Sequence, residues 1–353
     1  MEIKVVKTNA PKAMPQSDSL EFGVNFTDYM FMMDYTEGLG WYDATILPYG
    51  PIELMPAAMV LHYAQEVFEG LKAYRTPDGQ VQLFRPLENF RRLNRSNKRM
   101  CIPQIDEDFL LEALKQLVKL DAKWIPEGPG TSLYIRPFIF ATDPYIGVRV
   151  SKQYKFMIIM SPVASYYKGG MAPCRIFVEN EYARTVRGGT GEAKCGGNYA
   201  GGLAAQQKVK ELGYDQILWL DGETRTYIEE VGTSNVFFLI DDEFVTPSLE
   251  GTILSGITRK SVIELLRHWG KKVVERRITI DELYKAYQDG KVKEAFATGT
   301  AAVISPIGTL GWKDVEMTFN RGEIGQYAQK IYDTLYGVQV GEEKDELNWI
   351  EKV

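Results

Sequence analysis

The chain has 353 residues, of which 45% are hydrophobic and 12% aromatic, a length and composition that predict two globular domains. Its formal net charge of -6 and the lack of any basic run longer than a pair argue against binding to nucleic acids and other polyanions. The three cysteines have no C-x-x-C spacing, which argues against a disulfide framework and a zinc site and favours a reducing compartment.

The N-terminal segment does not resemble a targeting sequence. Residues 1–20 contain prolines and polar residues instead of the apolar core of a signal peptide. No stretch of the chain approaches the roughly 18 apolar residues that are needed to cross a bilayer. We therefore expect a cytoplasmic protein.

The first half of the chain predicts an α+β domain. Apolar residues recur at helical spacing after Pro56, Pro77-Asp78-Gly79 marks a hairpin turn, and Asp106 is a typical N-cap. The expected elements, in chain order, are strands over 30–35 and 41–47, a helix from Pro56 to Gly70, a hairpin over 71–74 and 81–84, helices over 87–98 and 107–122, and strands over 132–140 and 154–163.

A stretch rich in glycine, serine and proline over 165–173 predicts a linker between domains 1–164 and 174–353. Thr279 and Glu282 form a capping box in the second domain. The elements expected there are a strand over 174–179, a helix over 200–212, strands over 216–220, 226–230 and 235–240, helices over 257–269 and 280–288, a strand over 293–304 interrupted at 298–300, and a closing helix over 324–336.

The most informative stretch runs from Arg187 to Gly202, where seven glycines surround Lys194. The small neighbours Ala193 and Cys195 leave room for a flat group to approach the amine, as a Schiff base requires. The stretch lacks the G-x4-G-K-(S/T) pattern of a phosphate-binding loop, and Lys194 stands where the dinucleotide fingerprint needs glycine. A flexible surface loop and a covalent cofactor site remain as two interpretations.

The acidic and histidine side chains narrow the possible chemistry. His62 and His268 both lie in apolar helical patterns that are typical of packed or surface histidines, so histidine catalysis is disfavoured. Glu229 and Glu230 end an apolar strand and are either solvated or turned inward toward a cation. Beside a buried lysine, an inward acid would hold a pyridinium nitrogen.

Three further segments each allow a functional and a structural interpretation. Residues 255–258 precede a helix whose first N–H groups can bind an anion, or they supply only a side-chain cap. Arg92 is either a bidentate phosphate clamp or part of a solvated helix face. Tyr134 and Arg136 alternate onto one face of a strand with other aromatic residues, which indicates either a carboxylate pocket or an edge-strand salt bridge.

Seven blocks of sequence, in order over nearly the whole chain, resemble those of the branched-chain amino-acid aminotransferases, a family of fold-type IV pyridoxal-phosphate enzymes. The blocks are Asn25-Phe26-Thr27-Asp28, Phe68-Glu69-Gly70-Leu71-Lys72-Ala73-Tyr74, Tyr134-Ile135-Arg136-Pro137, the stretch from Gly188 to Ala200, Glu230-Val231-Gly232-Thr233-Ser234-Asn235, Leu254-Ser255-Gly256-Ile257-Thr258-Arg259 and Thr298-Gly299-Thr300-Ala301. The resemblance implies the two-domain α+β fold of aminotransferase class IV, which D-amino-acid aminotransferases share. In this fold a smaller N-terminal α/β domain precedes a larger C-terminal domain with a β-barrel-like core.

The resemblance also implies a site for pyridoxal 5'-phosphate. Lys194 would be the catalytic residue, which holds the cofactor as an internal aldimine and moves the proton between the substrate Cα and the cofactor C4′. Tyr199 would bond to the phenolic oxygen of the cofactor and Glu230 to its ring nitrogen. The other contacts to the phosphate and the ring would come from Arg92, Thr233, Leu254, Ile257, Thr258 and Thr300.

The substrate site is likewise implied by the resemblance. Tyr63, Thr300 and Ala301 would bind the substrate α-carboxylate. Arg136 would receive the side-chain carboxylate of glutamate, the second substrate. An apolar pocket for leucine, isoleucine or valine would be formed by Phe26, Phe68, Tyr134 and Tyr166.

The implied reaction is the reversible transfer of the amino group of L-leucine, L-isoleucine or L-valine to 2-oxoglutarate, giving the branched 2-oxo acid and L-glutamate. A homodimer is implied, in which a loop near residues 145–148 of a second subunit covers the pocket. Ala302 and Ser305 stand where some family members carry a redox C-x-x-C, so thiol regulation of that kind is not expected. The alternatives are a D-amino-acid aminotransferase, an aminodeoxychorismate lyase, or a non-catalytic protein that kept the fold; no metal or membrane partner is expected.

Overall fold

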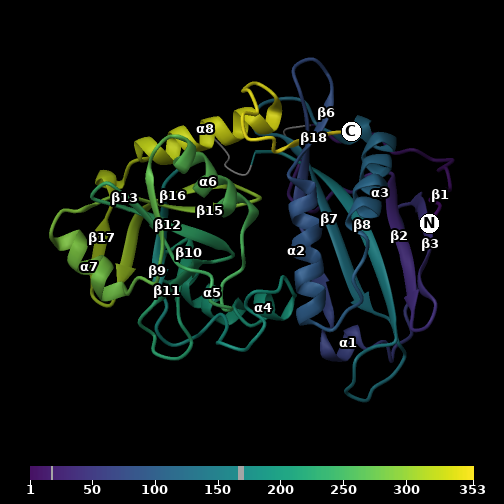
Figure 1. Cartoon of the computed structure of the whole chain (residues 1–353), viewed down its shortest axis with the longest axis horizontal. Helices are drawn as coiled ribbons and strands as arrows, with labels where there is room; N and C mark the ends of the chain where they lie inside the picture. Colours follow the sequence, from purple (N-terminus) through teal and green to yellow (C-terminus); the bar gives the residue numbers. More distant parts are fainter. Residues whose placement is uncertain (17–18, 166–170) are drawn as a thin grey trace. The chain divides into compact units, whose positions relative to one another are not determined.

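The computed structural model describes residues 1–16, 19–165 and 171–353, which form two compact units (Figure 1). Unit 1 comprises the described residues up to 165 together with Ala193–Gly196 and Gly337–Val353. Unit 2 comprises those from 171 to Glu192 together with Gly197–Tyr336. The chain thus enters unit 1 three times, and the shortest of these segments carries Lys194.

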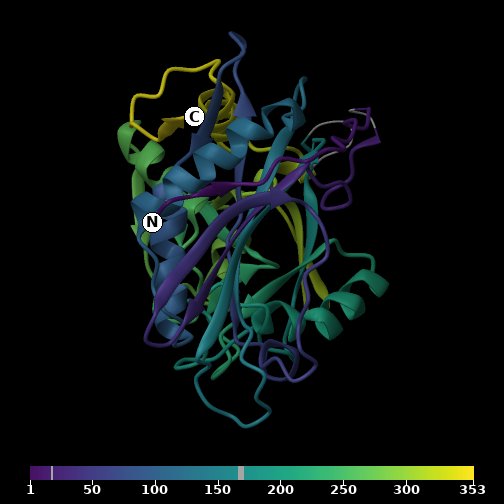
Figure 2. The same cartoon turned by 90° about the vertical axis from the view of Figure 1, so that its right-hand side faces the viewer.

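Within the described residues, unit 1 is built on a nine-stranded sheet in the order β1-β3-β2-β8-β7-β5-β6-β18, with β4 paired to β7. The strands β2, β3 and β8 run side by side as purple and teal ribbons in Figure 2. β7 lies inside the sheet, with β8 on one side and β4 and β5 on the other. The strands are β1 (Lys4–Val5), β2 (Tyr29–Thr36), β3 (Gly40–Pro48), β4 (Glu66–Phe68), β5 (Leu71–Arg75), β6 (Val81–Phe84), β7 (Ser132–Ala141), β8 (Gln153–Val163) and β18 (Ile350–Lys352).

The two long helices of unit 1, α2 and α3, lie along this sheet, and the short α1 lies at one end of it (Figure 1). One of them, α3, buries Leu110, Leu114 and Leu117 in the core of the unit, which explains its amphipathic pattern. Asp106 caps α3 as predicted, because its carboxylate accepts a 2.7 Å hydrogen bond from the N–H of Phe109. The helices are α1 (Val60–Tyr63), α2 (Pro86–Arg99) and α3 (Glu107–Leu120).

The C-terminal segment belongs to unit 1, whereas the sequence boundaries placed it with the second domain. β18 pairs with β6, and the amide of Gln82 donates to the carbonyls of Val338 and Gln339 over 3.0 and 2.9 Å. The pairing of β18 thus completes the outer edge of the unit 1 sheet with residues from the far end of the sequence.

The helix predicted from Pro56 to Gly70 is wrong. Only α1 is helical there, because Ala64 adopts a left-handed conformation with φ of 49° and ends it. Glu66–Phe68 then pairs with β7, and this tertiary pairing overrides the helical spacing of the apolar residues. Strand alternation buries Val67 in the core and turns Glu66 and Phe68 to the opposite face.

Within the described residues, unit 2 contains a second nine-stranded sheet, in the order β11-β10-β9-β16-β15-β12-β13-β14 with β17 paired to β16. β11 also pairs with β12, so the path from β11 to β12 closes into a ring. This ring confirms the predicted barrel-like core. The strands are β9 (Cys174–Val178), β10 (Gln216–Leu220), β11 (Ile228–Val231), β12 (Ser234–Ile240), β13 (Glu243–Thr246), β14 (Lys272–Glu275), β15 (Val292–Gly299), β16 (Val303–Trp312) and β17 (Val315–Thr318).

The helices of unit 2 follow the predicted pattern with one interruption. The helix expected over 200–212 is broken at Gly201 and Gly202, because glycine disfavours the helix interior. Thr279 caps α7 by accepting a 2.9 Å hydrogen bond from the N–H of Glu282, as predicted. The helices are α4 (Gly197–Ala200), α5 (Leu203–Glu211), α6 (Ile257–His268), α7 (Ile280–Gln288) and α8 (Gln326–Val340), whose last residues belong to unit 1.

Candidate active site

Three hydrogen bonds fix the backbone around Lys194 in unit 1. The N–H of Phe68 donates to the Lys194 carbonyl over 2.9 Å, and the Lys194 N–H donates to Ser96 Oγ over 3.0 Å. The N–H of Gly196 donates to the Glu66 carboxylate. The Lys194 amine lies over the Phe68 ring, with Nζ 4.6 Å from the ring centre. This part of the glycine-rich stretch is therefore held in place and is not a flexible surface loop.

Arg136 lies beside the same aromatic ring. Its guanidinium carbon is 4.7 Å from the centre of the Phe68 ring and 5.3 Å from that of Tyr134, and its Nη2 donates to Tyr134 Oη over 3.0 Å. Gly70 is required here, because a side chain at its position would overlap the Tyr134 hydroxyl. Since β7 is paired on both sides, the edge-strand salt bridge is excluded and the carboxylate-pocket interpretation of Arg136 remains.

Arg92 is buried, so its interpretation as a solvated helix face is wrong. Its Nε and Nη2 lie 2.7 and 2.8 Å from the two oxygens of Glu69, and Asn89 donates to the same carboxylate over 2.8 Å. Burial raises the pKa of Glu69, but attraction to Arg92 and these hydrogen bonds outweigh it and hold that pKa below its usual value. Glu69 was missed from the sequence, although an acid between Phe68 and Gly70 beside an apolar strand is a recognisable signal.

In unit 2, Glu230 is turned inward and is only 2% exposed. Arg184 Nε lies 2.8 Å from one carboxylate oxygen. Asn235 Nδ2 and the N–H of Leu254 donate to the other oxygen over 3.2 and 3.1 Å. The expected inward acid with a cationic partner is confirmed, and Arg184 is a second residue that sequence reasoning missed.

A cavity of about 140 Å³ in unit 2 brings together four residues of the predicted cofactor site. Tyr199, Glu230, Thr233 and Leu254 line it, and Trp219 adds an aromatic wall.

The start of α6 is a second predicted contact in unit 2. Gly256 is the N-cap residue, and within the described residues no side-chain hydrogen bond caps the helix. A side chain at Gly256 would overlap Asn235 Oδ1. Ile257 and Thr258 are the first helical residues and are buried, so the anion-binding interpretation is retained and the side-chain cap is excluded. Thr300 lies in the turn between β15 and β16.

The remaining predicted substrate residues have other neighbours. Phe26 stacks on Tyr49 with 4.8 Å between ring centres, and the Tyr63 hydroxyl donates to the carbonyl of Ile146. Ala301 follows Thr300 in the turn after β15. Tyr166 lies outside the described residues.

The family model for amino-transferase class IV matches residues 66–310, a range that spans both the Lys194 and the Glu230 environments. The chain belongs to this family. This aminotransferase is 57% identical to branched-chain-amino-acid aminotransferase 2 of Bacillus subtilis, over 99% of this chain and 97% of the relative.

Two solved structures share the fold of this aminotransferase. The branched-chain amino acid aminotransferase of Escherichia coli superposes with a TM-score of 0.76 at 25% identity, covering 92% of this chain and 98% of that one. The T.th. branched-chain amino acid aminotransferase, complexed with N-(5'-phosphopyridoxyl)-L-glutamate, has a TM-score of 0.72 at 26% identity and covers 90% of this chain and 97% of that one.

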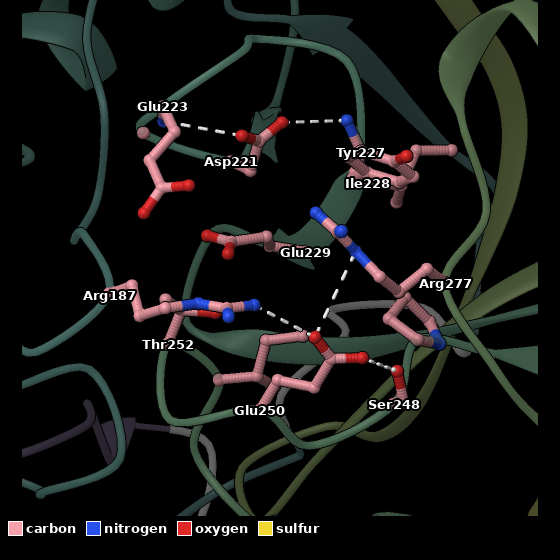
Figure 3. A pocket seen from close by; sticks show the side chains of 13 residues that line it. Arg187, Asp221, Glu223, Tyr227, Ile228, Glu229, Ser248, Glu250, Thr252 and Arg277 are labelled. Atoms are coloured by element: carbon pink, nitrogen blue, oxygen red, sulfur yellow. Dashed lines mark hydrogen bonds and ion pairs between the residues drawn. The ribbon is translucent and has the colours of Figure 1, made fainter.

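Strand alternation turns Glu229 to the opposite face from Glu230. Glu229 lines a separate cavity of about 30 Å³ (Figure 3). It is 5% exposed, and its Oε2 has no hydrogen-bond partner among the described residues. Burial raises the pKa of Glu229, although a hydrogen bond from Thr252 and the charge of Arg184 oppose the shift. The two adjacent acids of the aminotransferase therefore have different surroundings.

Other predicted features of the aminotransferase can be compared with the described part of the chain. No helix there is long and apolar enough to span a membrane, and no group of three or more His, Cys, Asp or Glu side chains is arranged to hold a metal ion. His62 is exposed and bonds to the Pro56 carbonyl, while His268 is exposed at the end of α6. Both are therefore surface histidines.

Proposed function

We propose that this aminotransferase reversibly transfers the amino group of L-leucine, L-isoleucine or L-valine to 2-oxoglutarate, with pyridoxal 5'-phosphate as cofactor. One observation carries the proposal: Lys194, with its backbone fixed, presents its amine to an aromatic face that also holds Arg136. A covalently bound cofactor needs such a lysine. The name of the Bacillus subtilis relative supports this substrate class.

The charged groups of the two units match the groups of this cofactor. Lys194 supplies an amine, Glu230 supplies a buried carboxylate for the ring nitrogen, and the N–H groups at the start of α6 suit a phosphate. When bound, the cofactor supplies an electron sink for cleavage of the substrate Cα–H bond. The phosphopyridoxyl ligand of the T.th. structure supports this choice of cofactor.

Each of these side chains then has a proposed role. Lys194 would move a proton from the substrate Cα to the cofactor C4′ in one half-reaction and in the opposite direction in the other. Arg92, oriented by Glu69, contacts the phosphate together with Thr300. Tyr199 donates to the phenolic oxygen. The remaining contacts to the ring and the phosphate come from Thr233, Leu254, Ile257 and Thr258.

The same aromatic face of unit 1 is proposed to receive both substrate side chains. Phe68 and Tyr134 contact the branched side chain, while Arg136 and the Tyr134 hydroxyl receive the carboxylate of glutamate. The substrate α-carboxylate binds in the turn at Thr300 and Ala301. Phe26 and Tyr166 remain predicted residues of the apolar pocket, and Tyr63 remains a predicted contact to the α-carboxylate.

An exposed apolar loop supports a homodimer. Ile146 and Val148 are 66% and 85% exposed, and the Tyr63 hydroxyl donates to the Ile146 carbonyl. Exposed apolar clusters often mark protein contacts. We propose that this loop covers the pocket of a second subunit in a cytoplasmic homodimer. Sedimentation of Val148→Asp tests the proposal, and this variant should sediment as a monomer. An unchanged dimer would contradict the role of the loop.

Half-reaction spectra of the pyridoxal-phosphate-loaded protein test the reaction. L-leucine and L-glutamate should change the cofactor absorbance much faster than D-alanine does. Lys194→Ala should slow both reactions by at least about 10²–10⁴-fold, because the proton carrier is lost, whereas Lys210→Ala should not. Preference for D-alanine, or release of pyruvate from aminodeoxychorismate, would favour the alternative enzymes. A protein that takes up no cofactor would contradict catalysis altogether.

A further inference from the structure

Glu66 is an acidic residue on the aromatic face of unit 1 that has no role in the proposed reaction. It lies opposite Phe140 in the pairing of β4 with β7, as Phe68 lies opposite Phe138. Directly paired residues of antiparallel strands point to the same face, and so do alternate residues of one strand. The Glu66 carboxylate is therefore on the side of the sheet that carries Arg136.

Glu66 is also joined to the lysine segment. Its Oε1 accepts the hydrogen bond from the N–H of Gly196, two residues after Lys194. A side chain at Gly196 would meet this oxygen, so the Glu66 carboxylate lies directly against the backbone of the lysine segment. One carboxylate thus contacts the lysine backbone and faces the same region as Arg136.

The electrostatic surroundings of Glu66 are cationic. Burial raises its pKa, and the charges of Arg136 and Lys194 both oppose that rise. Arg136 itself lies among aromatic rings, and its Nε is buried without a hydrogen-bond partner among the described residues. A guanidinium in such a place is costly unless a negative charge acts on it.

The inference rests on the proposed function, which makes two conflicting demands on the aromatic face. The face must accept an apolar side chain in one half-reaction and a carboxylate in the other. We propose that Glu66 is a specificity-determining residue: its carboxylate balances Arg136 while an apolar side chain is bound, and it competes with the substrate carboxylate for Arg136 when glutamate binds. Glu66 thereby shifts the preference of the face toward branched side chains.

Binding of two unreactive substrate analogues to the cofactor-loaded protein tests this role without turnover. Glutarate carries the second carboxylate, and 4-methylpentanoate carries the branched end. Glu66→Gln keeps an oxygen for the Gly196 N–H but removes the charge. Calorimetry measures the two dissociation constants. The constant for 4-methylpentanoate divided by that for glutarate should rise about tenfold in this variant, as expected when one unit charge is removed from a partly buried site.

Matched variants separate charge from structure. Glu37→Gln removes the same charge from a side chain that is 63% exposed in a surface pair with Lys152, and it should leave the ratio unchanged. Glu66→Asp withdraws the charge by one methylene and should raise the ratio less than Glu66→Gln does; it provides the test if Glu66→Gln does not fold. In an Arg136→Gln background, Glu66→Gln should have no effect on the ratio.

The outcomes distinguish the inference from the proposed function. If the wild-type protein binds both analogues and neither Glu66 variant changes their ratio, Glu66 only supports the backbone and the inference is overturned while the proposed function stands. An equal change in the Arg136→Gln background would also overturn it, because Glu66 would not act through Arg136. If the wild-type protein binds neither analogue, both the proposed function and the inference fail.

Discussion

Each unit contains a buried pair of glutamate and arginine, and the two pairs differ in which residue supports the other. In unit 1, two nitrogens of Arg92 lie 2.7 and 2.8 Å from the two oxygens of Glu69 in a fork. In unit 2, Nε of Arg184 lies 2.8 Å from Glu230, while Nη2 of Arg184 donates to backbone carbonyls over 2.6 and 3.0 Å.

The difference shows which partner orients the other. Glu69 uses both oxygens on Arg92 and also accepts from Asn89, so the acid is the support and the arginine is the proposed contact to the phosphate. Arg184 is fixed to the main chain by its carbonyl bonds, so in unit 2 the arginine is the support and Glu230 is the proposed contact to the ring. Similar ion pairs therefore support a proposed contact to an anion in one unit and a proposed contact to a cation in the other.

Removing the supporting acid of unit 1 should have the largest effect. Glu69→Gln leaves the Arg92 charge buried with an amide in place of the carboxylate, and we expect a loss of about 3–5 kcal/mol in the free energy of unfolding. Urea denaturation of the cofactor-free protein measures it. Glu88→Gln, which removes an acid from the exposed Arg91 pair on the same helix, should cost less than about 1 kcal/mol. Equal losses in the two variants would contradict the support role of Glu69.

Removing the supporting arginine of unit 2 should cost less. Arg184→Gln leaves Glu230 with the donors Asn235 and Leu254, so we expect a loss of about 2 kcal/mol and weaker retention of pyridoxal phosphate. Urea denaturation and equilibrium dialysis measure these two quantities. Arg187→Gln, in the same segment but 59% exposed at its side chain, is the matched control and should change neither. Unchanged cofactor retention in Arg184→Gln would show that Glu230 needs no orienting arginine.

The sequence predicted those elements whose signals are local. The cap at Asp106, the capping box at Thr279 and the turn at Asp78 all depend on residues close together in the chain, and the elements they mark are present. β4 was missed because only its pairing with the distant strand β7 makes it a strand. The short strands β13, β14 and β17, of four residues each, give too little alternation to be recognised.

The candidate site likewise contains some residues that local sequence signals predicted and others that depend on distant contacts. Lys194, Glu230 and Arg92 stand in motifs with unusual local composition, and the family resemblance indicated their roles. The supporting roles of Glu69 and Arg184 were not predicted, because their partners come from segments far apart in sequence. Burial also decided between alternatives: the sequence left Arg92 either solvated or functional, and only packing shows that it is 4% exposed.

Glu229 extends the comparison, because it is a buried acid that forms no ion pair within 4 Å among the described residues. Arg277 and Arg187 lie at the same small cavity, but both pair with Glu250, at 4.0 and 3.0 Å (Figure 3). The pKa of Glu229 is consequently raised by burial, whereas that of Glu69 is lowered. A nearby arginine is therefore not enough to keep a buried acid ionised at low cost; the arginine must contact it.

The raised pKa of Glu229 predicts the smallest of the three effects, with a definite sign. An acid whose pKa is higher in the folded than in the unfolded state stabilises the fold below its unfolded pKa and loses that contribution as the pH rises through its folded pKa. Because Glu229→Gln cannot ionise, its stability relative to wild type should improve as the pH rises from 4 to 8. Urea denaturation at the two pH values measures the change, and Glu223→Gln, at the exposed rim of the same cavity, should stay within about 0.5 kcal/mol of wild type at both. A Glu229→Gln variant that loses stability as the pH rises would mean that the Glu229 carboxylate, like that of Glu69, is stabilised in its ionised form.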